Sequence, residues 1–499
     1  LVIQSATQIP FHVRRNMANA LGIPKSKIRV IKPRIGGGFG AKQTAVVERF
    51  PAVVTWLTGK PSKIYYTREE TMIAGSARHE MEVTVKLGAM KDGTIRAIEV
   101  HALSNTGAYG EHGPTTIGLV GHKSIPLYSG KYEAFRFVAN TVYSNHPSAG
   151  AYRGYGATQG VFAMENTVNL MAHKLGIDPV KIREHNMLHE GDIMTAYNNE
   201  TANACALDQC MARCKEMMDW DSKFPAKTLP NGHIRSVGVA MAMQGSCISF
   251  VDEANVTIKM NDDGFYSLLV GSTDMGTGSD TILAQMAADV LECDLDDVVT
   301  YGVDTDTSPY DSGSYASSTT YLTGNAVVKA AEQLRQNITE QAAKRLECPK
   351  DEVAFDGKVL TCVSTGSSIT LKDLANQLQG GTEGWQSVTA GGNSPVSPPP
   401  YMVGMVEIDV DPETGKVVPI KYTACVDCGT VVNPNLARVQ TEGGLMQGLG
   451  MALYEGQNYN GTGFNRMRNL MQYKIPTRMD IPEIEVDFRQ SYEPTGPFG

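Results

Sequence analysis

Five glycine- or serine-rich segments are the part of this sequence best suited to chemistry. Glycine has no Cβ, so backbone N–H groups in such a segment can approach an anion closely. A loop that leads into a helix also brings the positive end of the helix dipole near a phosphate. Ordinary turns would account for any one segment, but five together predict a large, phosphate-bearing cofactor held mainly by backbone donors. They are residues 36–40, 150–156, 271–278, 315–320 and 442–450.

The first of these loops also resembles a dinucleotide-binding fingerprint. Its Gly36-x-Gly38-x-x-Ala41 spacing follows an expected strand and precedes an expected helix, as in a nicotinamide site. Such a site needs an acidic residue about 20 positions further on, at the end of a second strand. Glu48 comes too early and Glu69 too late. An NAD-dependent dehydrogenase is therefore the less supported alternative.

The elements that must position these loops follow from the hydrophobic periodicity, which predicts a mixed α/β chain. The expected helices are residues 11–21, 44–57, 159–175, 179–187, 281–291, 323–345 and 435–453. The expected strands are residues 28–33, 62–66, 81–87, 94–102, 255–260 and 266–270, and a second hairpin is expected around 411–415. Strand, turn, strand, glycine loop and helix recur in a similar order in both halves, without a residue-level repeat.

A polar stretch with prolines and a glycine separates the two halves. It runs from about residue 220 to residue 233 and contains Pro225, Pro230 and Gly232, which interrupt regular structure. We therefore expect one domain over residues 1–222 and a second over residues 234–499. The chain starts inside an expected strand and ends as abruptly, so we expect a fragment of a larger protein or one half of a split subunit.

Composition excludes several classes of protein. The net charge is -9 at pH 7, whereas a nucleic-acid-binding surface needs a basic stripe. No apolar run approaches the roughly 18 residues of a membrane span. The nine cysteines form no disulfide framework, which favours reduced thiols and the cytoplasm. The single Cys425-x-x-Cys428 pair cannot complete a four-ligand metal site.

The five segments, in this order and at this spacing, resemble the molybdenum-binding subunit of the xanthine dehydrogenase and aldehyde oxidoreductase family. The resemblance runs essentially from Leu1 to Gly499. It implies an α+β fold of two large mixed molybdopterin-binding domains with the cofactor between them. The implied cofactor is molybdopterin, commonly the cytosine dinucleotide in bacteria, and the pterin rather than a protein side chain would hold the molybdenum.

The resemblance also assigns residues around the cofactor. Gln8 matches a glutamine whose amide neighbours the metal's oxygen ligand, and Arg153 matches an arginine in a turn beside the metal, so both are candidate catalytic residues. Otherwise Gln8 would be a strand-end glutamine bonded to backbone, and Arg153 an ion-paired arginine. The full set of candidate cofactor-binding residues is Gln8, Gly38, Phe39, Gly40, Arg153, Gly154, Gly276, Thr277, Gly278, Tyr315, Ala316, Ser317, Thr319 and Gln447.

Three residues are candidates for substrate binding. Tyr155 stands where the family packs an aromatic ring on a ring substrate, although plain core packing is the alternative. Gln43 stands where many purine enzymes of the family have a glutamate, and an amide binds purine N–H groups more weakly. The substrate-binding arginine of the animal-type enzymes would fall near residues 119–122, where His122 is the substitute polar group. The catalytic glutamate of the family would follow a few residues after Gly499.

The implied activity is oxidative hydroxylation with water-derived oxygen. An N-heterocycle is favoured, a purine such as xanthine or hypoxanthine first; an aldehyde oxidoreductase or a nicotinate-type dehydrogenase is the alternative. The chain carries no iron–sulfur motif and no flavin domain, so an iron–sulfur subunit and an FAD subunit, or missing segments, would carry these groups in a dimer of heteromers. Without its glutamate the chain could instead be a cofactor-binding module with no catalysis of its own.

Overall fold

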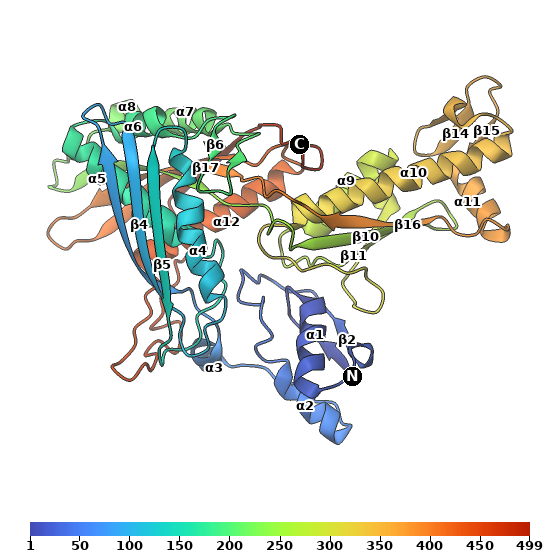
Figure 1. Cartoon of the computed structure of the whole chain (residues 1–499), viewed down its shortest axis with the longest axis horizontal. Helices are drawn as coiled ribbons and strands as arrows, with labels where there is room; N and C mark the ends of the chain where they lie inside the picture. The colour runs from blue at the N-terminus through green and yellow to red at the C-terminus, as the bar shows by residue number, and fades with distance from the viewer.

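The computed structural model describes residues 1–499 and consists of two lobes with a small N-terminal unit below them (Figure 1). Each part has its own hydrophobic cluster, of 35, 27 and 9 buried residues respectively. Each of the first four predicted loops connects elements of one part, so the loops meet only because the three parts pack together. No helix combines the length and the apolar composition that crossing a membrane requires.

The N-terminal unit holds the first glycine loop. β1 (Val2–Gln4) pairs in parallel with β2 (Arg29–Ile31), and α1 (Pro10–Leu21) packs against them. Proline at the first helical position starts α1, and Gly22 in the left-handed conformation ends it. The loop then runs from β2 to α2 (Arg49–Thr58). This unit therefore presents the loop towards the two lobes.

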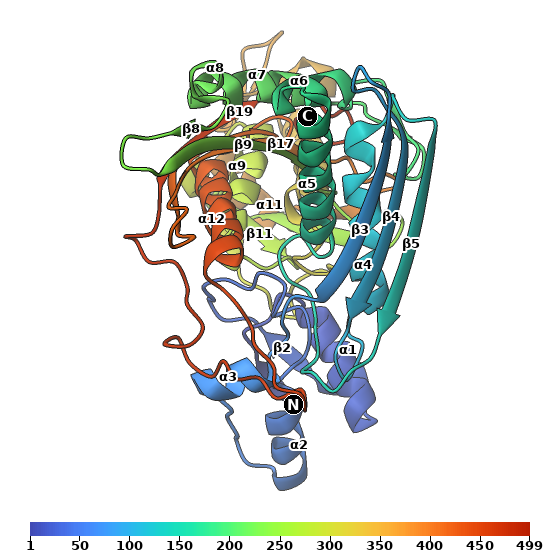
Figure 2. The same ribbon diagram turned by 90° about the vertical axis from the view of Figure 1, so that its left-hand side faces the viewer.

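The first lobe combines a three-stranded and a five-stranded sheet. In the three-stranded sheet β3 and β4 form the predicted hairpin and β5 runs parallel to β4, with α4 and α5 against the sheet (Figure 2). In the five-stranded sheet the order is β19-β18-β17-β9-β8, and α7 packs on it. The elements of the first lobe and its connections are α3 (Arg68–Ala74), β3 (Glu80–Ala89), β4 (Ile95–Asn105), α4 (Gly113–Ser124), β5 (Ala134–Val142), α5 (Ala157–Leu175), α6 (Pro179–Asn186), β6 (Ile193–Met194), β7 (Glu200–Thr201), α7 (Leu207–Met218), α8 (Trp220–Lys223), β8 (Lys227–Thr228), β9 (Ile234–Met243), β17 (Tyr401–Val410), β18 (Val417–Asp427) and β19 (Glu483–Arg489).

The second lobe is a four-stranded sheet covered by two helices. The order is β12-β11-β10-β16, and α9 and α10 pack against one another beside it. A small sheet of β13, β14 and β15 with α11 extends this lobe outwards (Figure 1). The elements are β10 (Glu253–Met260), β11 (Tyr266–Val270), α9 (Ser279–Leu291), β12 (Val298–Tyr301), α10 (Gly324–Leu346), β13 (Val353–Phe355), β14 (Val359–Cys362), β15 (Ser368–Thr370), α11 (Leu371–Gly380) and β16 (Ser387–Asn393).

One long helix, α12 (Pro434–Leu453), contacts both lobes. Its N-cap residue Asn433 donates from Nδ2 to Gln285 Oε1 on α9 (3.1 Å), and the carbonyl of Gln440 accepts a hydrogen bond from Arg153 Nη2 (2.8 Å) in the first lobe. The fifth glycine-rich segment, residues 442–450, lies within this helix, as the helix predicted over residues 435–453 implies. Its glycines let neighbouring groups approach the helix closely.

The lobes do not follow the sequence halves. The largest hydrophobic cluster joins residues before the expected boundary, such as Trp220, to Val239, Val403 and Cys425 after it. The polar stretch itself contains β8, which pairs with β9. The division into residues 1–222 and 234–499 stays a prediction about sequence domains, whereas packing crosses that line because β9 and β17 to β19 complete the first lobe.

Two local predictions are wrong. Residues 62–66 form no strand, because the alternating pattern is not enough where no neighbouring strand satisfies the backbone groups. The helix predicted from residue 44 begins only at Arg49, since residues 41–48 form turns that carry the end of the glycine loop. The other predicted helices, and both hairpins, are confirmed with ends shifted by a few residues.

Candidate functional site

Gln8 joins the first loop to the fourth. Its Oε1 accepts a hydrogen bond from the Gly40 N–H (2.9 Å), and its Nε2 donates to the Ser314 carbonyl (2.7 Å). The side chain is 3% exposed. A Cβ on Gly38 would lie 2.5 Å from Gln8 Oε1, so glycine is needed for this contact. Both ends of the amide therefore bond to protein backbone, and the contact with a metal ligand stays a prediction.

The first loop also reaches the second and the third. Gly40 has φ +99°, and a Cβ on it would lie 2.8 Å from the carbonyl carbon of Ala151, two residues before Arg153. The Gly37 N–H donates to the Met275 carbonyl (2.6 Å). Phe39, between these glycines, has φ +51° and remains 46% exposed. Three predicted segments thus lie in direct contact.

Arg153 and Gln447 come together as the resemblance predicts. Arg153 Nη1 donates to Gln447 Oε1 (3.2 Å), and Nη2 donates to the Gln440 carbonyl. A Cβ on Gly444 would lie 3.2 Å from the guanidinium carbon, so this glycine makes room for the arginine. Burial lowers the pKa of Arg153, and no carboxylate lies within 4 Å of it, so it is not the ion-paired arginine that was the alternative.

The third loop is already closed by a side chain of its own. Asp274 Oδ1 accepts hydrogen bonds from the N–H groups of Gly276 (2.8 Å), Thr277 (3.1 Å) and Gly278 (3.4 Å). The three backbone donors that were predicted to bind phosphate are therefore engaged with a carboxylate. The Gly276 carbonyl accepts from Gln440 Nε2 (3.3 Å), which fixes this loop to α12. The cofactor contacts of these three residues stay predictions.

The fourth segment is a turn with two successive left-handed residues. Ala316 has φ +51° and Ser317 φ +60°. The turn leads into one turn of π-helix (Thr319–Thr323) at the start of α10; π-helical turns occur frequently at functional sites. Burial, with the nearby Asp252, raises the pKa of Tyr315. Thr319 Oγ1 donates to Ser314 Oγ (3.2 Å), next to the carbonyl that Gln8 binds.

Two of the three substrate candidates are in contact, and the third lies elsewhere. The Tyr155 hydroxyl donates to Gln43 Oε1 (2.6 Å), and burial raises the pKa of Tyr155 to about 12. His122 instead stacks on the Tyr197 ring at 4.3 Å between centroids, and burial lowers its pKa to about 4. No hydrogen bond joins His122 to Gln43 or Tyr155, so the structure does not assemble all three, and the substrate role of His122 stays a prediction.

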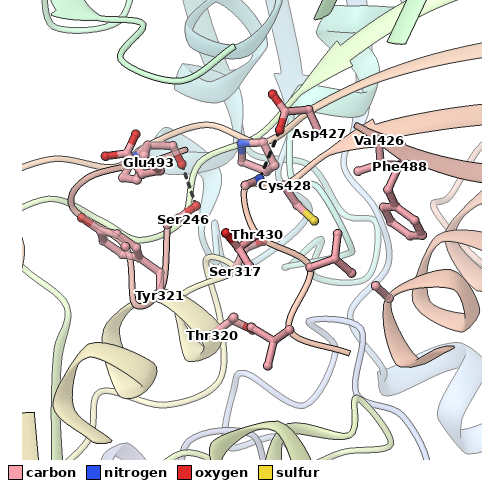
Figure 3. A pocket seen from close by; sticks show the side chains of 18 of the residues that line it. Ser246, Ser317, Thr320, Tyr321, Val426, Asp427, Cys428, Thr430, Phe488 and Glu493 are labelled. Atoms are coloured by element: carbon pink, nitrogen blue, oxygen red, sulfur yellow. Dashed lines mark hydrogen bonds between the residues drawn. The ribbon is translucent and has the colours of Figure 1, made fainter. Parts of the chain in front are cut away.

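A cavity of about 360 Å³ opens beside the third and fourth segments. Thr277 and Ser317 line it together with Thr320, Thr430 and Gly499 (Figure 3). Its other hydrogen-bonding groups are mostly hydroxyls and amides, and no lysine or arginine lines it. The two carboxylates in the lining, Asp427 and Glu493, are bonded to neighbouring N–H and hydroxyl groups.

These residues fit a phosphate-bearing pterin. The volume lies in the range of small-molecule sites, about 300–1,000 Å³. Neutral hydroxyl and amide groups can donate to phosphate oxygens and to the amide edge of a pterin. The glycines at positions 38, 40 and 444 let Gln8, Ala151 and Arg153 approach more closely than a Cβ would allow. The donor set therefore suits a large, polar cofactor held without a basic cluster.

Three contributors to this site escaped the sequence analysis. Asp274 closes the third loop, Gln440 connects it to Arg153, and Arg78 binds the turn that carries Arg153. An aspartate at the start of a glycine loop is a recognisable turn signal, so Asp274 was open to prediction. Arg78 and Gln440 act over long sequence separations and carry no local signal.

Comparison with known proteins defines the class. Two family models, each described as "Molybdopterin cofactor-binding domain", match residues 1–187 and residues 213–482. The chain is thus built from two molybdopterin cofactor-binding domains. It is 38% identical to the probable hypoxanthine oxidase XdhD of Escherichia coli strain K12 over 100% of its length and 53% of that protein. It is 35% identical to the putative xanthine dehydrogenase molybdenum-binding subunit XdhA of the same organism, over 100% of its length and 67% of that protein.

The chain belongs to the xanthine dehydrogenase and aldehyde oxidoreductase family of molybdopterin-binding subunits. Quinoline 2-oxidoreductase from Pseudomonas putida 86 has the same fold, with a TM-score of 0.90 at 23% identity over 99% of this chain and 66% of that chain. Aldehyde oxidoreductase from Desulfovibrio gigas gives 0.80 at 25% identity, over 100% and 53%. The predicted family and fold class are confirmed. The chain spans about half the length of XdhD.

Proposed function

We propose that this chain is the molybdenum-cofactor-binding part of a hydroxylase that oxidises an N-heterocycle, a purine such as hypoxanthine or xanthine first. The observation that carries the proposal is the direct contact of Gln8 with Gly40 and Ser314, and of Arg153 with Gln447. Together with the close approach of Gly40 to Ala151, these contacts join four of the five predicted segments, which are far apart in the sequence. XdhD is named a probable hypoxanthine oxidase and XdhA a putative xanthine dehydrogenase subunit, and both names support the same substrate class.

The bound cofactor would supply the two-electron oxidation. We propose that it is molybdopterin cytosine dinucleotide, with its phosphates near Thr277 and Ser317, which line the cavity. The backbone of Gly38 to Gly40, Gly154, the 276–278 turn and the 315–319 turn would surround it. Gln8 and Arg153 would orient groups beside the metal, Gln8 by its amide and Arg153 through its contact with Gln447.

The substrate would lie against Tyr155, with Gln43 at its edge. The Tyr155 hydroxyl fixes the Gln43 amide by binding its Oε1, which leaves Nε2 as the donor for substrate. The base that accepts the proton would be a glutamate that follows Gly499. Gly499 itself lines the cavity. We further propose a cytoplasmic dimer of heteromers, in which an iron–sulfur subunit and an FAD subunit receive the electrons.

An aldehyde oxidoreductase is the second candidate, favoured by the neutral side chain of Gln43 and by the absence of an arginine among residues 119–122. Nicotinate remains a third substrate class. Turnover of hypoxanthine, xanthine, nicotinate and a simple aldehyde by the intact complex separates these. We expect the purines to be the best substrates. Turnover confined to the aldehyde would overturn the purine proposal.

Metal and cofactor content tests the enzyme proposal itself. We expect molybdenum and pterin in equal amounts in the purified complex. A protein that binds both but turns over none of the four substrates would be a cofactor-binding module. We expect the chain that ends at Gly499 to be inactive and the chain that continues through the glutamate to be active in the complex. Turnover by the shorter chain would show that the base lies within residues 1–499.

A further inference from the structure

Arg78 binds the turn that carries Arg153 and Tyr155. Its Nη2 donates to the Arg153 carbonyl (2.9 Å), and its Nη1 donates to the Tyr155 carbonyl (3.0 Å) and to Thr158 Oγ1 (2.7 Å). One guanidinium therefore reaches three acceptors within six residues of chain. These carbonyls belong to the 153–154 and 155–156 peptides, so the guanidinium holds both ends of the Gly154–Tyr155 segment.

The backbone between these carbonyls is in an unusual conformation. Gly154 has φ +88° and Tyr155 has φ +49°. The left-handed region costs a residue with a Cβ roughly 1–2 kcal/mol, so a tyrosine there must be held by its surroundings. The Tyr155 N–H donates to the Tyr152 carbonyl (2.7 Å), and Arg78 binds the carbonyls of Arg153 and Tyr155.

Arg78 has no carboxylate partner within 4 Å, although it is half-buried. Its guanidinium lies over the Tyr152 ring at 4.2 Å from the centroid, and Nε lies 3.2 Å from Met451 Sδ. Burial lowers the pKa of Arg78 to about 10, which leaves it protonated at neutral pH. Buried charges are usually paired with an opposite charge, whereas Arg78 directs its Nη donors to one turn and its Nε to Met451 on α12.

We propose that Arg78 is a positioning residue for the site: it holds the turn from Arg153 to Thr158 and thereby directs Tyr155 towards Gln43 and Arg153 towards Gln447. The consequence for catalysis rests on the proposed function, but the structural role does not. Arginine suits this task because its planar fork carries five N–H donors in fixed directions. A lysine keeps the charge but is a single point donor that cannot span the same acceptors.

Hydrogen–deuterium exchange of the purified chain tests the structural role without cofactor. The variants are Arg78→Lys, Arg78→Gln and, as a matched control, Arg136→Lys on β5, where the arginine side chain is 70% exposed. We expect Arg78→Lys to raise exchange at least tenfold in residues 152–160 and to leave β10 and α10 unchanged. The control should leave all three unchanged.

Two outcomes overturn the structural role. Wild-type exchange of residues 152–160 in Arg78→Lys would show that the turn holds itself. Equally faster exchange throughout the chain would make Arg78 a general stabilising residue. If Arg78→Gln does not fold, Arg78→Lys still decides between these outcomes, because it preserves the charge.

Kinetics of the complete enzyme test the link to substrate. We expect Arg78→Lys to raise KM several-fold more than it lowers kcat. Tyr155→Phe should have a smaller effect in the Arg78→Lys background than in the wild type, because both changes weaken the contact of Tyr155 with Gln43. Additive effects would overturn the link to Tyr155. Absence of molybdopterin would instead refute the proposed function and leave the exchange result standing.

Discussion

Substitution of Gly40 by alanine tests whether the contact between the first and second loops builds the site. Gly40 has φ +99°, and the new Cβ would lie 2.8 Å from both the carbonyl carbon and the oxygen of Ala151. Backbone atoms cannot rotate away, so the loop must move. Its movement breaks the hydrogen bond from the Gly40 N–H to Gln8 Oε1. The Ala151 turn and Gln8 then no longer share one surface.

The size of the effect follows from these contacts. Overpacking against a fixed group costs about 1–3 kcal/mol, and a lost hydrogen bond costs about 1 kcal/mol. The sum of about 2–4 kcal/mol corresponds to a roughly 30- to 1,000-fold smaller population of the closed loop. The strained φ of the alanine adds a further cost, which needs its own control.

Gly59→Ala is that control. Gly59 ends α2 with φ +67°, and its new Cβ would meet nothing within 4 Å. It bears a comparable left-handed backbone cost without the clash. The assay is exchange of the Gly40 amide in the chain without cofactor, together with the molybdenum and pterin content of the complex. We expect Gly40→Ala to lose protection and cofactor, and Gly59→Ala to keep both. Equal behaviour of the two variants would refute the reasoning.

Three further changes test the substrate edge, the third loop and a buried acid. Gln43→Glu keeps an acceptor for Tyr155 and adds a charge that can pair with purine N–H groups, so steady-state kinetics should give a KM for xanthine about tenfold lower; an unchanged or higher KM contradicts this. Asp274→Ala removes the acceptor shared by three amides, and urea unfolding should show a loss of about 1–2 kcal/mol, with Asp274→Asn, which keeps an acceptor oxygen, losing less; equal losses would argue against the hydrogen bonds. Burial raises the pKa of Asp311 from 3.8 to about 7. The folded chain therefore holds a proton that the unfolded chain has lost between these pH values, and this contribution to stability falls as pH rises through the window. Asp311→Asn should remove that slope from urea midpoints measured between pH 4 and pH 7.5, and an unchanged slope would assign it to other groups.

Helices and strands that bury one face could be predicted from the sequence. α10 and the hairpin of β3 and β4 follow the hydrophobic pattern because burial of one side sets that pattern. The assembly of the elements was not open to prediction in the same way. β9 follows the polar stretch in sequence, yet it pairs with β17 more than 150 residues later, and no local pattern records that pairing.

The candidate site divides along the same line. Gly38 and Gly40 could be predicted because they lie in a glycine-rich loop between an expected strand and an expected helix. The close contacts with Gln8 and Ala151 show why glycine is needed at these positions. Arg78 could not be predicted, since its role depends on carbonyls 75 and 77 positions later in the chain. The position of His122 depends likewise on a ring, Tyr197, from a distant segment.

Left-handed backbone conformations of residues other than glycine are a feature of the site that the sequence does not predict. A glycine in the sequence can indicate a left-handed backbone conformation. Phe, Tyr, Ala and Ser give no such indication, because that conformation costs a residue with a Cβ roughly 1–2 kcal/mol. Such strain persists only where tertiary contacts impose it, and it gathers at functional sites. Setting aside asparagines and the residues that end helices, most of the left-handed residues with a side chain belong to the predicted loops, touch Tyr155 or lie next to Gly499. They are Phe39, His112, Tyr155, Ala316, Ser317 and Phe498, and Phe250 is the exception. Because these residues lie on segments that contact one another, we expect the left-handed conformation of each to depend on the presence of the others, as we propose for Tyr155 and Arg78.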